Sequence, residues 1–232
     1  MSLEWRLWVA ATDTAAHAAV LDMVAPLVGV TDDDLDASYP SHLSSPGLER
    51  RVDTYYAFAG CEACGVKLRS GTRLEAKILL ETGEGGVELW RKVRAPPPAS
   101  ESPAHVALAL EDILPEAAAA LRNAVELTEK PQSMRIDTVK RRRSASVANA
   151  WIELTRVELL SHLGAQLWNG ITVAIEARSS GSVLDCAQSL GLARLVDANP
   201  SIVMASYPAF IAAQALTEDT GDAPSSSAMV DE

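Results

Sequence analysis

The 232-residue sequence is poor in aromatic residues, in cysteine and in positive charge. Phe, Trp and Tyr make up 5% of the chain, so its core has to be filled mainly by Ala, Val and Leu. The three cysteines, an odd number, exclude a plausible disulfide framework and are typical of a reducing compartment. The formal charge of -11 disfavours a general affinity for nucleic acid, because such binding needs clustered, exposed cations. Any anion-binding site in this chain must therefore be local.

Long apolar runs are also missing. No stretch approaches the length of about 20 apolar residues that crosses a bilayer as a helix. The first residues lack the basic region, apolar core and small-residue cleavage site of a secretory signal. These absences predict a cytoplasmic protein with neither a membrane nor nucleic acid as a partner, and they leave its oligomeric state open.

Short runs with period-two patterning predict eight β-strands, because alternate side chains of a strand face opposite sides. Eight strands of this length suit a closed antiparallel barrel or tunnel with flanking helices, an α+β fold that is mainly β. The expected strands cover residues 3–10, 50–59, 65–70, 73–81, 86–94, 134–142, 147–158 and 171–178.

Helical patterns separate some of these strands. Residues 13–28 carry an apolar face of 3.6-residue period, and Gly29 follows as a stop signal. Residues 103–129 form a second helical region, which Pro115 is expected to divide or kink. Shorter helices are expected at 182–190 and 207–216, and a loop at 31–47.

The length and the hydrophobic content of 48% are compatible with one domain around one core. We expect this domain to span residues 1–216. Residues 217–232 are acidic and rich in Ser, and this composition predicts a disordered tail.

Several predicted strands carry their charges on one face only. In residues 65–70, Lys67 and Arg69 share a face, while the opposite face is apolar, and similar patterns occur in 73–81, 86–94 and 134–142. Antiparallel sheets commonly turn such a face to water, so one interpretation is an apolar barrel with a solvated surface. The alternative is that the ionic face lines a wide interior and helices cover the apolar outside. The spacing alone does not choose between them.

An interior lined by Lys and Arg would suit a polyanion such as triphosphate. Converging cations stabilise phosphate groups through charge-assisted hydrogen bonds, and Arg adds bidentate geometry. Carboxylates at one end would hold Mg²⁺ or Mn²⁺, which prefer oxygen ligands and bridge to phosphate.

A series of short motifs follows one another along the chain: a "DTYY"-like strand, then "LR", "ELK"-like, "W-x-K" and "K-x-R" strands, a late acidic strand and a closing "LG … SYP" region. These fragments are Val52–Tyr56, Gly65–Arg69, Leu74–Lys77, Glu88–Lys92, Val139–Arg142, Val173–Glu176, Leu190–Gly191 and Ser206–Pro208. In order and spacing, the chain between residues 3 and 212 resembles the CYTH-type triphosphate tunnel family.

The resemblance implies a tunnel that binds tripolyphosphate or a triphosphorylated small molecule and hydrolyses it with the help of Mg²⁺ or Mn²⁺. It implies catalytic roles for Glu176 and Lys77, and metal ligation by Glu4, Glu176 and Glu75. The implied substrate-binding residues are Arg6, Lys67, Arg69, Lys77, Lys92, Lys140 and Arg142.

Two departures from the family pattern concern carboxylates. The family's first strand usually reads Glu-x-Glu-x-Lys, whereas Glu4 is followed here by Arg6 and Trp8. The late acidic strand often carries two Glu residues two apart, whereas here Glu176 stands alone. Hydrolysis needs a metal to neutralise phosphate charge and to orient water, so the departures bear more on catalysis than on anion binding.

Two functions from different classes therefore remain open. The first is a metal-dependent hydrolase of triphosphate or a triphosphorylated compound. The alternative is a non-catalytic module on the same fold, which binds polyphosphate or another protein. No pattern in the sequence identifies the organic group attached to the phosphates.

Overall fold

The domain is built mainly from β-strands. The computed structural model describes residues 1–35, 47–58, 61–127 and 134–218. The strands in these ranges are β1 (Ser2–Ala10), β2 (Glu49–Tyr56), β3 (Cys64–Arg69), β4 (Arg73–Thr82), β5 (Glu88–Ala95), β6 (Arg135–Val147), β7 (Ala150–Ser161), β8 (Gln166–Ala177) and β9 (Val203–Met204).

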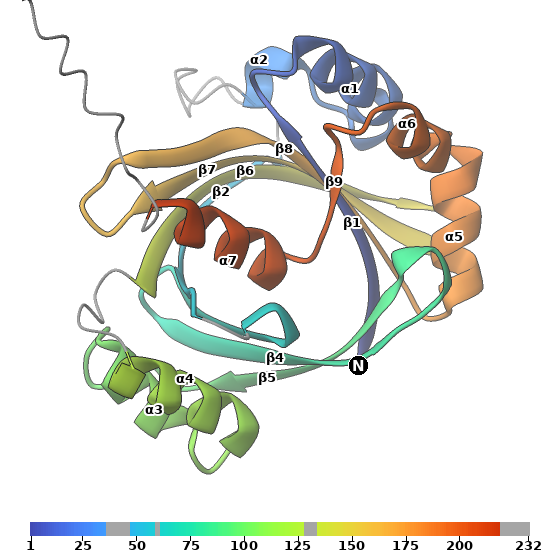
Figure 1. Ribbon diagram of the computed structural model, residues 1–232. Helices are drawn as coiled ribbons and strands as arrows, with labels where there is room; N and C mark the ends of the chain where they lie inside the picture. The colour runs from blue at the N-terminus through green and yellow to red at the C-terminus, as the bar shows by residue number, and fades with distance from the viewer. Residues whose placement is uncertain (36–46, 59–60, 128–133, 219–232) are drawn as a thin grey trace, which may run out of the picture.

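Eight of these strands form a closed antiparallel barrel (Figure 1). Their order is β5-β4-β3-β2-β6-β7-β8-β1, and pairing of β1 with β5 completes the ring. The predicted fold class and all eight predicted strands are confirmed. The two-residue strand β9 pairs with β1 beyond the ring and was not predicted, because so short a strand has no periodicity to detect.

Helices surround and enter the barrel. The first, α1, begins after Asp13, whose carboxylate accepts a hydrogen bond from the Ala16 amide at 3.0 Å, and it ends at the predicted stop signal Gly29, where φ is 68°. Pro115 divides the second helical region into two helices, as expected. The described helices are α1 (Thr14–Val28), α2 (Asp32–Leu35), α3 (Pro103–Leu110), α4 (Pro115–Leu127), α5 (Ser180–Ser189), α6 (Leu192–Ala198) and α7 (Tyr207–Glu218).

The short helix α2 lies inside residues 31–47, which the sequence predicts as a loop, so that prediction was wrong at 32–35. Both the amide and the hydroxyl of Thr31 donate to the Asp34 carboxylate, at 2.9 and 3.0 Å. A run of Asp therefore starts a helical turn through local side-chain hydrogen bonds. Residues 36–46 lie outside the described part of the chain.

The outer face of the barrel is apolar and is covered by helices on two sides. On one side, outward residues of β1, β7 and β8 such as Leu7, Leu154 and Val173 pack against α1, α5 and α6. On the other side, Val66 and Leu68 of β3 and their neighbours on β4 pack against α3 and α4. The charged faces of the strands consequently point inward.

One end of the barrel is filled by α7, which Figure 1 shows inside the ring of strands. Phe210 of α7 stacks on Trp8 with ring centroids 4.0 Å apart, and the Trp8 indole donates to the Ala205 carbonyl at 2.8 Å. Tyr207 stacks on Tyr55 at 5.6 Å. This aromatic plug closes the end of the ring at which β1 finishes. The β3–β4 turn and the β6–β7 hairpin lie at the opposite end.

The predicted tail begins too early, because residues 217 and 218 belong to α7. The remaining residues, 219–232, lie outside the described part, and the tail stays a prediction there. None of the helices in the described ranges combines the length and the apolar character needed to cross a membrane.

Candidate functional site

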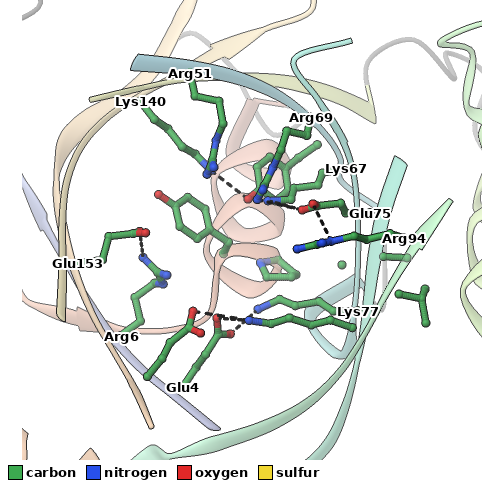
Figure 2. Close-up of a pocket in the computed structure, with 18 of the residues that line it drawn as sticks. Glu4, Arg6, Arg51, Lys67, Arg69, Glu75, Lys77, Arg94, Lys140 and Glu153 are labelled. Atoms are coloured by element: carbon green, nitrogen blue, oxygen red, sulfur yellow. Dashed lines mark hydrogen bonds and ion pairs between the residues drawn. The ribbon is translucent and has the colours of Figure 1, made fainter. Parts of the chain in front are cut away.

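A cavity of about 510 Å³ lies inside the barrel next to the aromatic plug (Figure 2). Nine cationic side chains line it, together with four carboxylates. The cations are Arg6, Arg51, Lys67, Arg69, Lys77, Lys92, Arg94, Lys140 and Arg142, and the carboxylates are Glu4, Glu75, Glu153 and Glu176.

Strand alternation produces this lining. On β3, Lys67 and Arg69 face the cavity while Val66 and Leu68 face the helices outside. All seven predicted substrate-binding residues and all three predicted metal ligands line this one cavity. The interpretation in which these charged faces point to solvent is therefore wrong for these strands, whereas the roles of the individual residues stay predictions.

Asp53 on β2 is fully buried beside the cavity and draws three cations together. One carboxylate oxygen lies 3.1 Å from Lys140 Nζ, 3.1 Å from Arg51 Nε and 3.5 Å from Lys67 Nζ. Burial alone would raise the pKa of Asp53, but the charges of Lys140, Lys67 and Arg51 outweigh it and hold that pKa well below its usual range. Asp53 is therefore a permanent anion at this point of the wall.

For the two lysines beside Asp53, burial has a larger effect on the pKa than the neighbouring opposite charge. Burial lowers the pKa of Lys67 to about 8, although Asp53 favours its charged form. Burial also lowers the pKa of Lys140, again against the pull of Asp53. The Lys140 ammonium lies 3.0 Å from the Tyr55 hydroxyl and 3.8 Å from the centre of the Tyr207 ring. Three cations share Asp53, and two of them lie near a second carboxylate as well: Lys67 is 3.3 Å from Glu75, and Arg51 is 3.4 Å from Glu49.

Glu75 on β4 is the centre of a second group. Its carboxylate lies 2.9 Å from Arg69, 2.9 Å from Arg73, 3.3 Å from Lys67 and 3.6 Å from Arg94. Burial raises the pKa of Glu75, but the charges of Lys67 and Arg69 outweigh it and lower that pKa overall. Figure 2 shows this group on the opposite side of the cavity from Glu153 and Arg6.

Glu4 on β1 forms a third group with cations of β4 and β5. One of its oxygens accepts from Lys77 at 2.9 Å and the other from Lys92 at 3.0 Å. Glu176 faces Glu4 across the β1–β8 pairing and lies 3.6 Å from Lys92. Burial would raise the pKa of Glu4, but Lys77 and Lys92 hold it well below its usual range. Burial, and then the charge of Glu4, raise the pKa of Glu176.

The fourth group holds the remaining carboxylate of the lining. Glu153 on β7 accepts from Arg142 at 2.6 Å and from the Thr155 hydroxyl at 3.1 Å, and Arg6 lies 3.8 Å away. Burial raises the pKa of Glu153, but the charges of Arg6 and Arg142 outweigh it and lower that pKa overall. Each carboxylate that lines the cavity is thus already next to at least one cation.

The three predicted metal ligands do not form one group. Glu4 and Glu176 are cross-strand neighbours, but Glu75 belongs to the arginine-rich group described above. Within the described ranges, no three His, Cys, Asp or Glu side chains are arranged to hold a metal ion. The pair formed by Glu4 and Glu176 fits Mg²⁺ or Mn²⁺ only if a bound phosphate supplies the other oxygen ligands.

Some residues of the site were not named among the predicted ligands. Arg51, Asp53 and Tyr55 alternate along β2, so the period-two pattern that identified Lys67 and Arg69 would have found them as well. Arg94 continues the alternation of Trp90 and Lys92 on β5. Tyr207 and Pro208 also line the cavity, and no sequence signal places a helix of that length inside a barrel.

Comparisons with known proteins add little. No family model matches the sequence, and no curated protein matches it. Among solved structures, 22 chains match. One of them is described as a "putative adenylate cyclase" from Bacillus halodurans: it is 13% identical, the match covers 82% of this chain and 90% of that chain, and the TM-score is 0.39. Likeness of this degree carries no inference about activity, so the functional argument depends on the cavity.

Proposed function

We propose that this protein binds a triphosphate, free or as part of a triphosphorylated small molecule, inside the barrel. The observation that carries the proposal is the lining of the cavity, in which nine cations face four carboxylates, and Asp53, buried beside the lining, adds a fifth. This excess of positive charge occurs in a chain whose formal charge is -11, so it is concentrated at one place. A compact polyanion is the ligand class that such a lining favours.

The electrostatics of the cavity lining point in the same direction. Buried like charges repel one another strongly, because the local dielectric constant is lower than that of water. Burial is the main cause of the lowered pKa values of Lys67 and Lys140, and repulsion from neighbouring cations lowers them further, so each lysine holds its proton less firmly than it would in water. A bound polyanion would restore the charged forms and would gain charge-assisted hydrogen bonds in return.

The arrangement also suits a chain of phosphate groups better than one phosphate. The cations come from six neighbouring strands of the ring, and they include Lys67 and Arg69 on β3, Lys77 on β4 and Arg142 on β6. Arg residues contribute the forked geometry that binds two phosphate oxygens at once. The ordered fragments that resemble the triphosphate tunnel family support the same ligand class.

Hydrolysis of the bound triphosphate is a second candidate function, and the carboxylate pair of Glu4 and Glu176 favours it. Two adjacent carboxylates, one with a raised pKa, form a place where an added cation would be stabilising. A divalent metal that arrives with the phosphates would neutralise their charge and orient water for attack. Lys77 and Lys92, both hydrogen-bonded to Glu4, would hold phosphate oxygens beside this pair.

Titration calorimetry with inorganic triphosphate tests binding, first with EDTA and then with Mg²⁺ or Mn²⁺. Lys92→Ala and Arg91→Ala form a matched pair, because each removes one cation from the same strand. Lys92 faces the cavity, whereas Arg91 faces outward and pairs with Glu116 on α4. We expect Lys92→Ala to weaken binding by about 10- to 100-fold, which corresponds to the loss of a charged hydrogen bond, and Arg91→Ala to leave it unchanged. Equal effects of the two changes would contradict the proposal.

Phosphate release in the same samples tests the second candidate function. Binding with EDTA, together with release only after a divalent metal is added, would support hydrolysis. Binding without release under any of these conditions would identify a non-catalytic triphosphate-binding protein.

A further inference from the structure

Trp151 is the exception among the five tryptophans of the chain. Trp5, Trp8 and Trp90 are buried, and Trp168 packs against the aromatic plug, whereas half of Trp151 is exposed. A large indole exposed to water is not accounted for by packing. Its position relative to the cavity therefore matters.

The register of the barrel places Trp151 on the inner face at the mouth of the cavity. Trp151, Glu153 and Thr155 alternate along β7, so all three share one face of the strand. Glu153 lines the cavity, and Trp151 lies two residues further toward the end that α7 does not fill. Its cross-strand partner on β8 is Glu176, which also lines the cavity.

A second hollow lies beside the cavity at this point. Its volume is about 960 Å³, and Trp151 and Glu176 both belong to its lining. Because Glu176 lines both spaces, the two adjoin each other. Leu3, Leu89, Asn149 and Arg178 are among the other residues of its lining, which is partly apolar and partly polar.

The aromatic rings that line the cavity each have a cation against them, and the ring of Trp151 does not. Arg6 lies 4.4 Å from the centre of the Tyr207 ring, and Lys67 lies 5.5 Å from the centre of the Tyr55 ring. Within the described residues, no cation or aromatic ring lies against Trp151. Trp151 is thus an uncovered aromatic surface beside a cation-lined cavity.

We infer that Trp151 stacks on a planar aromatic ring of the ligand, so that the preferred ligands are triphosphates that carry a heterocyclic base. This inference rests on the proposed binding of triphosphate. The aromatic plug closes the far end of the barrel, so a group attached to the bound phosphates extends toward the mouth. There the flat indole offers a stacking surface, and the Asn149 amide offers a donor and an acceptor to ring substituents.

The test compares three probes in EDTA: ATP, methyl triphosphate and inorganic triphosphate. In the wild-type protein we expect ATP to bind more tightly than methyl triphosphate, because only ATP carries a ring. Trp151→Ala should weaken ATP binding by about 5- to 100-fold, the effect typical of losing one stacked base, and should leave both other affinities within about twofold. Trp151→Phe should restore most of the loss, because phenylalanine retains a flat ring.

Leu163→Ala is the matched control, since Leu163 is an exposed apolar residue in the β7–β8 turn, at the end of the barrel that α7 fills. It should change none of the three affinities. If inorganic triphosphate binds but Trp151→Ala leaves ATP binding unchanged, or weakens all three probes equally, the role of Trp151 is refuted and the proposed function stands. If inorganic triphosphate does not bind the wild-type protein, the proposed function itself fails.

Discussion

Replacing Asp53 by Asn tests the view that buried carboxylates hold the cations of the cavity in place of a ligand. The change keeps the shape of the side chain and removes its charge. Asp53 is fully buried, and three cationic nitrogens lie within 3.5 Å of one of its oxygens. The variant therefore leaves Lys140, Arg51 and Lys67 without their common anion.

Removing one partner of a buried ion pair costs about 3 to 5 kcal/mol of unfolding free energy. The lower end of that range applies here, because a lysine can escape the penalty by releasing its proton. The pKa of Lys67 is about 8 with Asp53 in place, and loss of that anion lowers it further, so releasing the Lys67 proton at pH 7 in the variant costs at most about 1.4 kcal/mol, the energy of one pKa unit. We expect a loss of about 3 kcal/mol at pH 7, which should shrink as the pH rises toward 9.

Urea unfolding measures this loss, and Asp137→Asn is its control. Asp137 accepts a hydrogen bond from Thr54 at 2.6 Å on the outer face of the same strand pair, so its replacement should cost about 1 kcal/mol. Added triphosphate should stabilise Asp53→Asn more than the wild type, because it supplies the missing negative charge. Wild-type stability in Asp53→Asn, or an equal effect of triphosphate on both proteins, would refute the argument.

Three further predictions concern protons, metal and the plug. Because burial lowers the pKa of Lys67 to about 8, its charged form decreases as the pH rises through 8. Triphosphate binding at pH 8 should therefore take up protons, and calorimetry in buffers of different ionisation enthalpy measures this uptake, which should disappear at pH 6. Glu176→Gln should abolish any metal-dependent phosphate release but retain triphosphate binding in EDTA; retained release would remove Glu176 from the reaction. Phe210→Ala should lower the unfolding free energy by about 3 to 5 kcal/mol in urea titrations, because the Phe210 ring stacks on Trp8 in the core of the plug; a loss below about 1 kcal/mol would contradict that packing.

The sequence predicted the strands well, because alternation of charged and apolar residues is a local property. Val66, Lys67, Leu68 and Arg69 already define two faces of β3 without any tertiary information. The direction of each face was not predictable in this way, since a charged face is equally compatible with solvent. Only the helices packed on Val66 and Leu68 decide that the cations point inward.

For a related reason, the sequence could not predict which charged side chains of the site lie next to one another. Glu75 was expected beside Glu4 and Glu176, but the register of β3, β4 and β5 places it among arginines. Alternation along β2 places Asp53 on the same face as Arg51 and Tyr55, but its burial depends on contacts with Lys140, which is 87 residues away. Such long-range contacts follow from barrel closure and not from local pattern.

The pairing between β1 and β5 makes the barrel a ring with a weak link. Three residue pairs join these strands, whereas twelve join β6 and β7. Beyond those three pairs, the edge of β1 pairs with β9 instead of with β5. The ion pair between Glu4 and Lys92 crosses this link from inside the cavity. Local opening is expected to start where the fewest backbone hydrogen bonds hold two strands together. A ligand that binds the cations of β5 together with those of the other strands would hold β1 and β5 together. Its binding should therefore slow the exchange of backbone amide hydrogens along β1 and β5.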